Sequence, residues 1–372
     1  MSVLFTPARI GTLELRNRFV RSATNDRMAT TDGKVTDDLV DYYGLLARGG
    51  IGLIITGHAY VHPLGQGSVR QLGVYDDGMI SGLKRIADVV HEFDGRIAAQ
   101  ITHAGRQTQK EIIGETPVAP SAIPYGLQKV MPRELSDAEI ETIIDDFAGA
   151  ADRVREAGFD AVQLHGAHGY LINQFLSPFS NKRTDGWGLA GRSSGHDQEG
   201  RFKFLHEVYR AVREKVGPGF PVFIKLAMKD FVEGGLDIET TISIARRIRK
   251  LGIDAIETSG GFSNAMENIK RDVLPGKGEA YFRNEAARLK RGVDVPVILV
   301  GGLRSLATME DVVNGGDADF VSLSRPFIRE PDLVLKLRSG AREVSCISCS
   351  KCSISREPVL KCLALEKESE SK

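Results

Sequence analysis

The sequence lacks any long hydrophobic run, and it contains little tryptophan or cysteine. One Trp and four Cys occur in 372 residues. No segment reaches the roughly 18 consecutive apolar residues of a membrane span. The first residues also lack the basic stretch, apolar core and small-residue cleavage site of a secretory signal. We therefore expect a cytoplasmic protein with no membrane partner.

A net charge is also absent, because Lys plus Arg and Asp plus Glu each number 49. The composition therefore does not indicate the basic surface that binds nucleic acid or anionic lipid. A small-molecule substrate is the remaining expectation. The assembly state is left open, and a homo-oligomer is one of its alternatives.

Short apolar runs rich in β-branched residues alternate with amphipathic stretches along most of the chain. The stretch 136–158 is predicted to be a helix, because Ser136 and Glu139 have capping-box spacing and Gly158 follows the last apolar position. Eight nearly continuous apolar runs separated by helices indicate an α/β fold, a (β/α)8 TIM barrel. We expect a barrel over residues 1–340 and a cysteine-containing extension over 341–372. The predicted strands are 18–24, 51–61, 96–105, 160–169, 221–228, 254–261, 296–302 and 319–327, and further helices are predicted at 37–49, 79–93 and 238–252.

Active sites in such barrels lie at the carboxyl ends of the strands. The fourth predicted strand leads into His165, His168 and Tyr170. Two neutral imidazoles, or one imidazolium, can polarise a carbonyl oxygen while the phenol delivers a proton. The alternative interpretation is that both histidines are hydrogen-bonded core or capping residues.

Two further predicted strands carry polar side chains near their ends. Gln100 presents a planar amide that suits a heteroaromatic ring, and an ordinary buried amide is the alternative. Lys225 has three interpretations: it holds an anionic ring, forms a Schiff base, or pairs with Asp230.

The seventh and eighth predicted strands end in Gly301-Gly302 and Ser324-Arg325. Loops at these places commonly bind phosphate in barrels, through backbone N–H groups and a helix N-terminus. A phosphate site, a ring-binding amide and a cation together indicate a bound phosphorylated cofactor.

Three motifs in this chain are specific in combination: HAGR at 103–106, HGAHGYLINQFLSP at 165–178 and SNKRTDGWG at 180–188. With them, the sequence resembles the old yellow enzyme family of NAD(P)H:flavin oxidoreductases, especially the bacterial branch related to 2,4-dienoyl-CoA reductase and the thermophilic-type ene-reductases. The resemblance implies FMN as cofactor and NADH or NADPH as reductant. It implies an electrophilic alkene as substrate: an enone, a nitroalkene, or a dienoyl or enoyl thioester.

The resemblance also implies residue roles. The side chains that match His165 and His168 bind the activating oxygen of the alkene, and the one that matches Tyr170 protonates the α-carbon after hydride transfer to the β-carbon. The other matched positions bind FMN, with Ser22, Ala23, Thr24, His58, Gln100 and Lys225 at the ring and Gly301, Gly302, Ser324 and Arg325 at the phosphate.

Three features depart from the family pattern. Asn25 stands where relatives carry Cys or Thr, His58 replaces a usually small residue, and the segment 188–202 is longer than the usual turn. We expect the first two to alter flavin redox behaviour or substrate shape, and the third to alter the pocket rim.

The cysteines need a separate interpretation. The spacing of the first three suits a four-cysteine iron–sulfur or zinc site. Cluster-bearing relatives, however, have longer second and final gaps and continue into a second dinucleotide-binding domain. We therefore expect thiols without metal, and the iron–sulfur cluster and the zinc site are the alternatives. The residues concerned are Cys346, Cys349, Cys352 and Cys362.

Two other functions compete with the flavin oxidoreductase. One is a flavin-free barrel lyase or aldolase with Lys225 as the Schiff base, and the other is a non-catalytic flavin carrier. Gln100 and the HGAHGY segment favour the oxidoreductase, because an aldolase needs neither a ring-binding amide nor two histidines that anchor a carbonyl.

Overall fold

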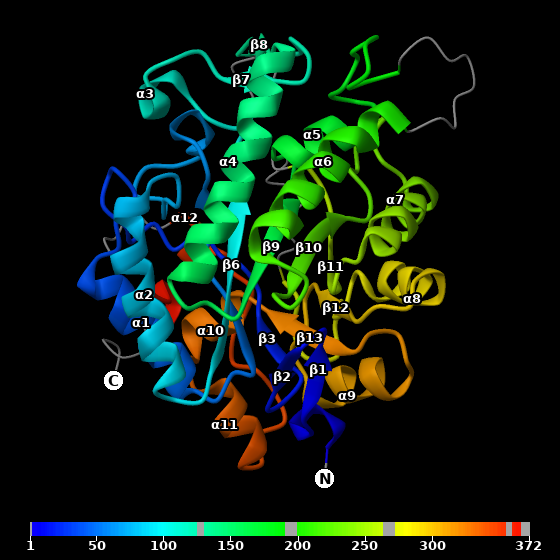
Figure 1. The fold of residues 1–372 in the computed structure, drawn as a ribbon. Coiled ribbons are helices and arrows are strands. Elements are labelled where there is room, and N and C mark those ends of the chain that lie inside the picture. Colours follow the sequence, from blue (N-terminus) through cyan, green and yellow to red (C-terminus); the bar gives the residue numbers. More distant parts are fainter. Residues whose placement is uncertain (1, 125–129, 190–198, 263–271, 355–358, 366–372) are drawn as a thin grey trace.

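The structure is a computed structural model that describes residues 2–124, 130–189, 199–262, 272–354 and 359–365. Its main sheet has nine parallel strands in the order β4-β3-β13-β12-β11-β10-β9-β6-β5, and pairing of β4 with β6 closes it. β5 pairs with β6 but is not part of the closed ring. The other eight strands form a barrel at the centre of the molecule (Figure 1). The barrel strands are β3 (Phe19–Arg21), β4 (Leu53–Ile55), β6 (Arg96–Thr102), β9 (Ala161–Gly166), β10 (Val222–Ala227), β11 (Ala255–Ser259), β12 (Val297–Val300) and β13 (Phe320–Leu323), and the remaining strands are β1 (Ala8–Ile10), β2 (Leu13–Leu15), β5 (Ala59–Tyr60), β7 (Val118–Ala119) and β8 (Arg133–Glu134).

Each of the eight predicted runs contains one barrel strand, which confirms the (β/α)8 prediction. The runs are mostly apolar because one face of each strand packs inside the barrel and the other packs under helices. The second run, 51–61, is divided into β4 and β5 with Gly57 between them. A Cβ at Gly57 would lie 2.7 Å from the carbonyl oxygen of Thr24, so the chain approaches the end of β3 closely there.

Helices follow the barrel strands and surround them (Figure 1). The capping box predicted for α4 is present: Ser136 Oγ accepts from the N–H of Glu139, and the Glu139 carboxylate accepts from the N–H of Ser136. The helices are α1 (Asp37–Arg48), α2 (Ile80–His91), α3 (Lys110–Ile113), α4 (Asp137–Glu156), α5 (Leu171–Leu176), α6 (Glu199–Val216), α7 (Ile238–Leu251), α8 (Arg283–Gly292), α9 (Leu306–Asn314), α10 (Arg325–Arg329), α11 (Leu333–Arg338) and α12 (Lys351–Ile354), with 3-10 turns at Val3–Phe5, Pro63–Gly65 and Asp77–Met79.

The inside of the barrel has its own core, separate from the layer between strands and helices. Ile10, Leu13 and Leu15 of the β1–β2 hairpin pack in it against side chains such as Phe223 and Phe320. This hairpin closes the amino-terminal end of the barrel, so the carboxyl ends of the strands are left for the site.

The C-terminal extension packs on the barrel. The N–H of Leu306 donates to the carbonyl of Arg342, and the N–H of Val344 donates to the carbonyl of Arg304. Cys346, Cys352 and Leu360 are buried in the main core.

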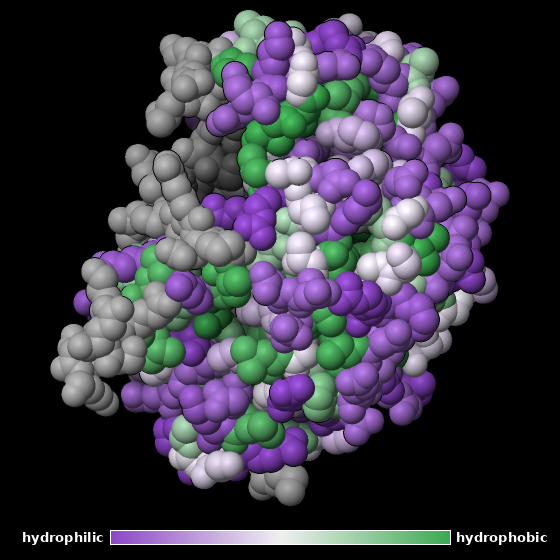
Figure 2. Space-filling view, turned by 90° about the vertical axis from the view of Figure 1, so that its left-hand side faces the viewer, coloured by the Kyte–Doolittle hydropathy of each residue, from purple (hydrophilic) through white to green (hydrophobic). Residues whose placement is uncertain are grey.

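No helix among the described ranges is long and apolar enough to cross a membrane. On the face shown in Figure 2, hydrophilic side chains dominate and hydrophobic ones lie in separate small groups.

Candidate active site

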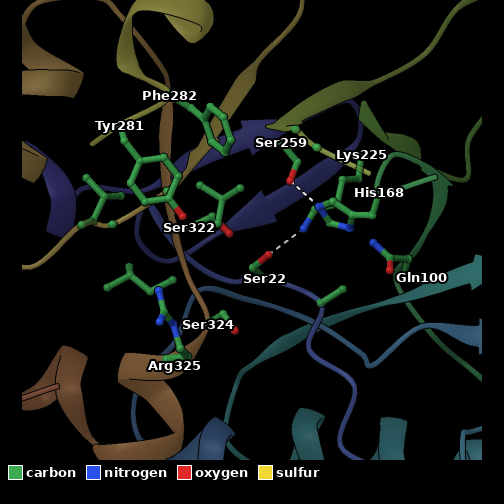
Figure 3. A pocket seen from close by; sticks show the side chains of 18 of the residues that line it. Ser22, Gln100, His168, Lys225, Ser259, Tyr281, Phe282, Ser322, Ser324 and Arg325 are labelled. Carbon is green, nitrogen blue, oxygen red and sulfur yellow. Dashed lines mark hydrogen bonds between the residues drawn. The ribbon is translucent and has the colours of Figure 1, made fainter. Parts of the chain in front are cut away.

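A cavity of about 440 Å³ lies at the carboxyl ends of the strands, a volume typical of small-molecule sites. Figure 3 shows Gln100, Lys225 and His168 at one end of it and Ser324 and Arg325 at the other. Of the thirteen residues predicted for the site, all but Thr24 are among the described residues that line the cavity; these are Ser22, Ala23, His58, Gln100, His165, His168, Tyr170, Lys225, Gly301, Gly302, Ser324 and Arg325. Thr24 instead places its Oγ1 2.7 Å from Oγ of Ser324.

Lys225 lies in a buried ion pair at the floor of the cavity. Its Nζ is 3.1 Å from Oε2 of Glu257, its cross-strand neighbour in β11, and donates to Oγ of Ser22 at 2.7 Å. The pairing of Lys225 with Asp230 considered from the sequence is therefore wrong. Asp230 accepts hydrogen bonds from Ser177 and Asn173 instead, because it lies beyond the end of β10.

Two buried amides extend this network across the barrel. Gln100 donates to Oε1 of its cross-strand neighbour Gln163 at 2.7 Å, and Gln163 donates to Glu257 at 2.9 Å. Ser322 donates to the other oxygen of Glu257 at 2.8 Å. The chain of bonds fixes the plane of the Gln100 amide at the cavity wall. The sequence analysis missed Gln163 and Glu257, although a lone acid inside an apolar strand was a usable signal.

The predicted His-Tyr cluster is compact. The ring centroid of His165 lies 4.6 Å from that of Tyr170 and 5.1 Å from that of His168. Burial is the main cause that holds the pKa of His168 down at about 3 and the pKa of His165 well below its usual range, and the positive charge of Lys225 adds to both shifts. Both shifts favour the neutral imidazole over the imidazolium at pH 7.

His168 has a left-handed backbone, with φ of +60°. Its Nε2 lies 2.6 Å from Oγ of Ser259, a contact drawn in Figure 3, and its carbonyl accepts from the amide of Gln107. These contacts hold the ring at the cavity. The Nδ1 of His165 is buried with no hydrogen-bond partner among the described residues, which leaves a polar atom for a ligand to satisfy.

The opposite end of the cavity is cationic. Arg304 and Arg325 both line it, next to Gly301 and Gly302. Both glycines have positive φ, and a Cβ on Gly302 would lie 2.7 Å from the ring of Tyr281, so only glycine fits there. This end combines positive charge with glycine backbone at the cavity wall, which suits a phosphate group.

The sequence analysis also missed part of the cavity wall. Ser259 is the last residue of β11 and the two glycines follow it, so the rule used for the other strand ends would have found them. Tyr281 and Phe282 precede α8 on a connection without periodicity, and no local signal marks them.

The family model of the NADH:flavin oxidoreductase / NADH oxidase family matches residues 3–343. The chain belongs to this family. The match confirms the predicted family and the predicted FMN cofactor, and it ends close to the boundary predicted at residue 340.

Relatives in this flavin oxidoreductase family include an NADH oxidase of Thermoanaerobacter brockii, 38% identical over 93% of this chain and 52% of the relative. An NADPH dehydrogenase of Geobacillus sp. (strain WCH70) is 37% identical over 89% of this chain and 92% of its own. The chain thus spans about half the length of the first relative and nearly all of the second.

Solved structures agree with this assignment. A 2-naphthoyl-CoA reductase complex aligns with a TM-score of 0.87 at 29% identity, over 94% of this chain and 54% of that chain. A morphinone reductase in complex with tetrahydroNAD aligns with a TM-score of 0.74 at 30% identity, over 91% of both chains.

The residues that line the cavity fit FMN. The cavity has a Lys225–Gln100 end and a separate arginine end, whose donors suit the ring and the phosphate of one ligand. Lys225 is a donor for an anionic ring, and Gln100 adds an oriented amide.

Two departures from the family pattern lie at the site. Asn25 lines the cavity and donates to Oγ of Ser68 at 2.9 Å. His58 lines the cavity beside Tyr170, with ring centroids 5.1 Å apart. The third departure, 188–202, falls largely on residues 190–198, which lie outside the described residues.

The four cysteines are free and line a second, smaller cavity together with Arg329. In the part of the chain that the structure describes, no three His, Cys, Asp or Glu side chains are arranged to hold a metal ion.

Proposed function

We propose that this protein reduces activated C=C bonds at the expense of NADH or NADPH. The observation that carries the proposal is the neutral His165–His168 pair beside the Tyr170 phenol, in the same cavity as the Lys225–Gln100 end. Bound FMN supplies hydride chemistry in this cavity, and the side chains bind the alkene and handle its proton.

The imidazoles anchor the substrate in this proposal. As neutral groups, His165 and His168 donate N–H bonds to a carbonyl or nitro oxygen without placing a full charge beside it. Donation draws electron density from the conjugated alkene and stabilises the oxygen as it gains negative charge. Burial strengthens this effect because little water competes.

Tyr170 delivers the proton. When hydride reaches the β-carbon, the new C–H bond leaves a negative charge shared by the α-carbon and the anchored oxygen. The Tyr170 O–H bond breaks, its proton forms a bond to the α-carbon, and the phenolate recovers a proton from solvent. The balance is one alkene, one NAD(P)H and one proton to one saturated product and one NAD(P)⁺.

Lys225 is unsuited to the lyase alternative. A Schiff base needs a neutral, accessible amine, whereas Lys225 is 2% exposed and pairs with the carboxylate of Glu257. Similar structures are named as reductases of morphinone and of 2-naphthoyl-CoA, which supports the reductase proposal.

Anaerobic stopped-flow spectroscopy tests the proposal. NADH or NADPH should bleach the yellow absorbance of the FMN-loaded protein, and an enone, a nitroalkene or an enoyl thioester should restore it. A protein that bleaches but is not reoxidised by any compound in such a panel would not be an ene-reductase.

A further inference from the structure

We propose that His58 is a positioning residue for proton delivery: its Nε2–H donates to the Tyr170 phenol oxygen, and Gln71 imposes the imidazole tautomer that allows this. The sequence analysis predicted His58 only as an FMN contact. The inference rests on the proposed function, because it concerns the acid of that reaction.

The orientation of the Gln71 amide is set by the backbone. Its Oε1 accepts from the N–H of Gly67 at 2.7 Å and from the N–H of Ser68 at 3.2 Å. Two N–H donors require an oxygen at that position, so the amide cannot be turned over. Gln71 is fully buried, and its Nε2 must therefore face the other way.

The Nε2 of Gln71 faces His58. It donates to the carbonyl oxygen of His58 at 2.9 Å and lies 2.6 Å from Nδ1 of the same residue. Because Nε2 of an amide is a donor, Nδ1 of His58 must be the acceptor. A neutral His58 then carries its proton on Nε2.

His58 is neutral at ordinary pH. Burial is the main cause that lowers its pKa to about 4, and the positive charge of Lys225 lowers it further. Two other titratable groups face it, Tyr170 and His165, with ring centroids 5.1 and 6.0 Å away, and burial also lowers the pKa of His165.

The protonated Nε2 of His58 lies 3.4 Å from the hydroxyl oxygen of Tyr170. This contact is long for a hydrogen bond, as catalytic contacts often are before the substrate binds. A donor to the phenol oxygen favours the negative charge that this oxygen gains when it releases its proton. The opposite tautomer would accept the phenol proton and compete with the substrate for it. The tautomer therefore decides whether His58 helps or hinders the acid.

A matched pair of substitutions separates this role from cofactor binding. In His58→Gln the amide nitrogen reaches about as far as Nε2 of histidine, so a donor to Tyr170 is kept. In His58→Asn the amide nitrogen reaches only about as far as Nδ1, so the donor is lost while the size remains similar.

We expect His58→Asn to slow alkene reduction by about tenfold, the effect of one lost hydrogen bond to a developing charge, and His58→Gln to recover most of that rate. The rate of FMN reduction by NAD(P)H should fall less than the rate of alkene reduction in His58→Asn. In a Tyr170→Phe background, His58→Asn should have no additional effect, because the acid on which it acts is gone.

The outcomes distinguish the two proposals. If Tyr170→Phe alone leaves alkene reduction unchanged, the acid assigned in the proposed function is wrong. If Tyr170→Phe slows that step but His58→Asn does not, the role of His58 is wrong. The role is also wrong if His58→Asn slows that step by the same factor in the Tyr170→Phe background. A loss of FMN affinity or of FMN reduction in step with alkene reduction would make His58 a cofactor contact instead.

Discussion

Tyr170 is half-buried at the cavity wall, with its ring against His165 and its hydroxyl oxygen beside His58. Tyr170→Phe keeps the ring and removes the proton. We expect alkene reduction to slow by about 10²-fold, the size of a general-acid contribution, and FMN reduction to change by less than about twofold. Single-turnover measurements of each half-reaction check this. Tyr75→Phe, outside the cavity, is the matched control, and equal slowing of both half-reactions would make Tyr170 structural.

Two histidines at the cavity, the buried His58 and the partly buried His168, predict a pH dependence of stability. The pKa values of His58 and His168 fall from 6.5 to about 4 and about 3, mainly through burial. Below pH 6.5 the unfolded chain therefore binds protons that the folded chain does not. The free energy of unfolding should be highest above pH 6.5 and should fall as the pH drops toward 4.

Chemical denaturation at a series of pH values measures this dependence. His168→Asn should flatten the curve between pH 6.5 and 4, because one such group is removed. A His168→Asn curve as steep as that of the parent protein would contradict the assignment.

At the scale of elements, the register between β10 and β11 places Lys225 directly opposite Glu257. Glu257→Ala leaves the buried ammonium without its carboxylate, and we expect a loss of about 3–5 kcal/mol in the free energy of unfolding. Asp88→Asn, which breaks the exposed pair with Lys84 on α2, should cost less than about 1 kcal/mol. Denaturant titration compares the two, and similar small losses would show that the buried pair is unimportant to folding.

The barrel was predictable because its strands are apolar on both faces and its helices have clear periodicity. Polar residues at the strand ends, such as His165 and Gln100, were predictable for the same reason: the fold brings those ends together. The β1–β2 hairpin was not predicted, because its strands have three residues each and carry little pattern. The position of Tyr281 in the cavity wall and the bond from Gln71 to His58 depend on contacts between loops. No local sequence pattern predicts which loops come into contact.

At the scale of the whole molecule, the C-terminal extension reaches back to the cationic end of the cavity. Arg304 donates to Oγ of the buried Ser348 from Nε at 3.2 Å and from Nη2 at 2.9 Å. Arg325 donates to Oγ of Ser350 at 2.7 Å. Residues beyond the predicted boundary at 340 thus orient both arginines that face the proposed phosphate position.

Ser348→Ala tests this contribution. Without its hydroxyl acceptor, the Arg304 side chain is less well oriented, and we expect the Kd for FMN to rise by about fivefold to tenfold. Fluorescence titration of the apoprotein with FMN measures the change. Ser339→Ala, at the exposed end of α11, should leave the Kd unchanged. An unaltered Kd in Ser348→Ala would show that the extension does not support cofactor binding.

The left-handed backbone at His168 also limits how this site can diverge. Most side chains are strained at φ near +60°, and histidine, asparagine, aspartate and glycine are the residues that tolerate it best. Histidine and asparagine are the two of these that offer an N–H donor while neutral. Among substitutions that preserve an oxygen-anchoring N–H group here, the backbone therefore favours asparagine, before any substrate is considered. In proteins that share this site, substrate specificity can therefore change through the loops around the cavity, whereas the residue at this turn is constrained.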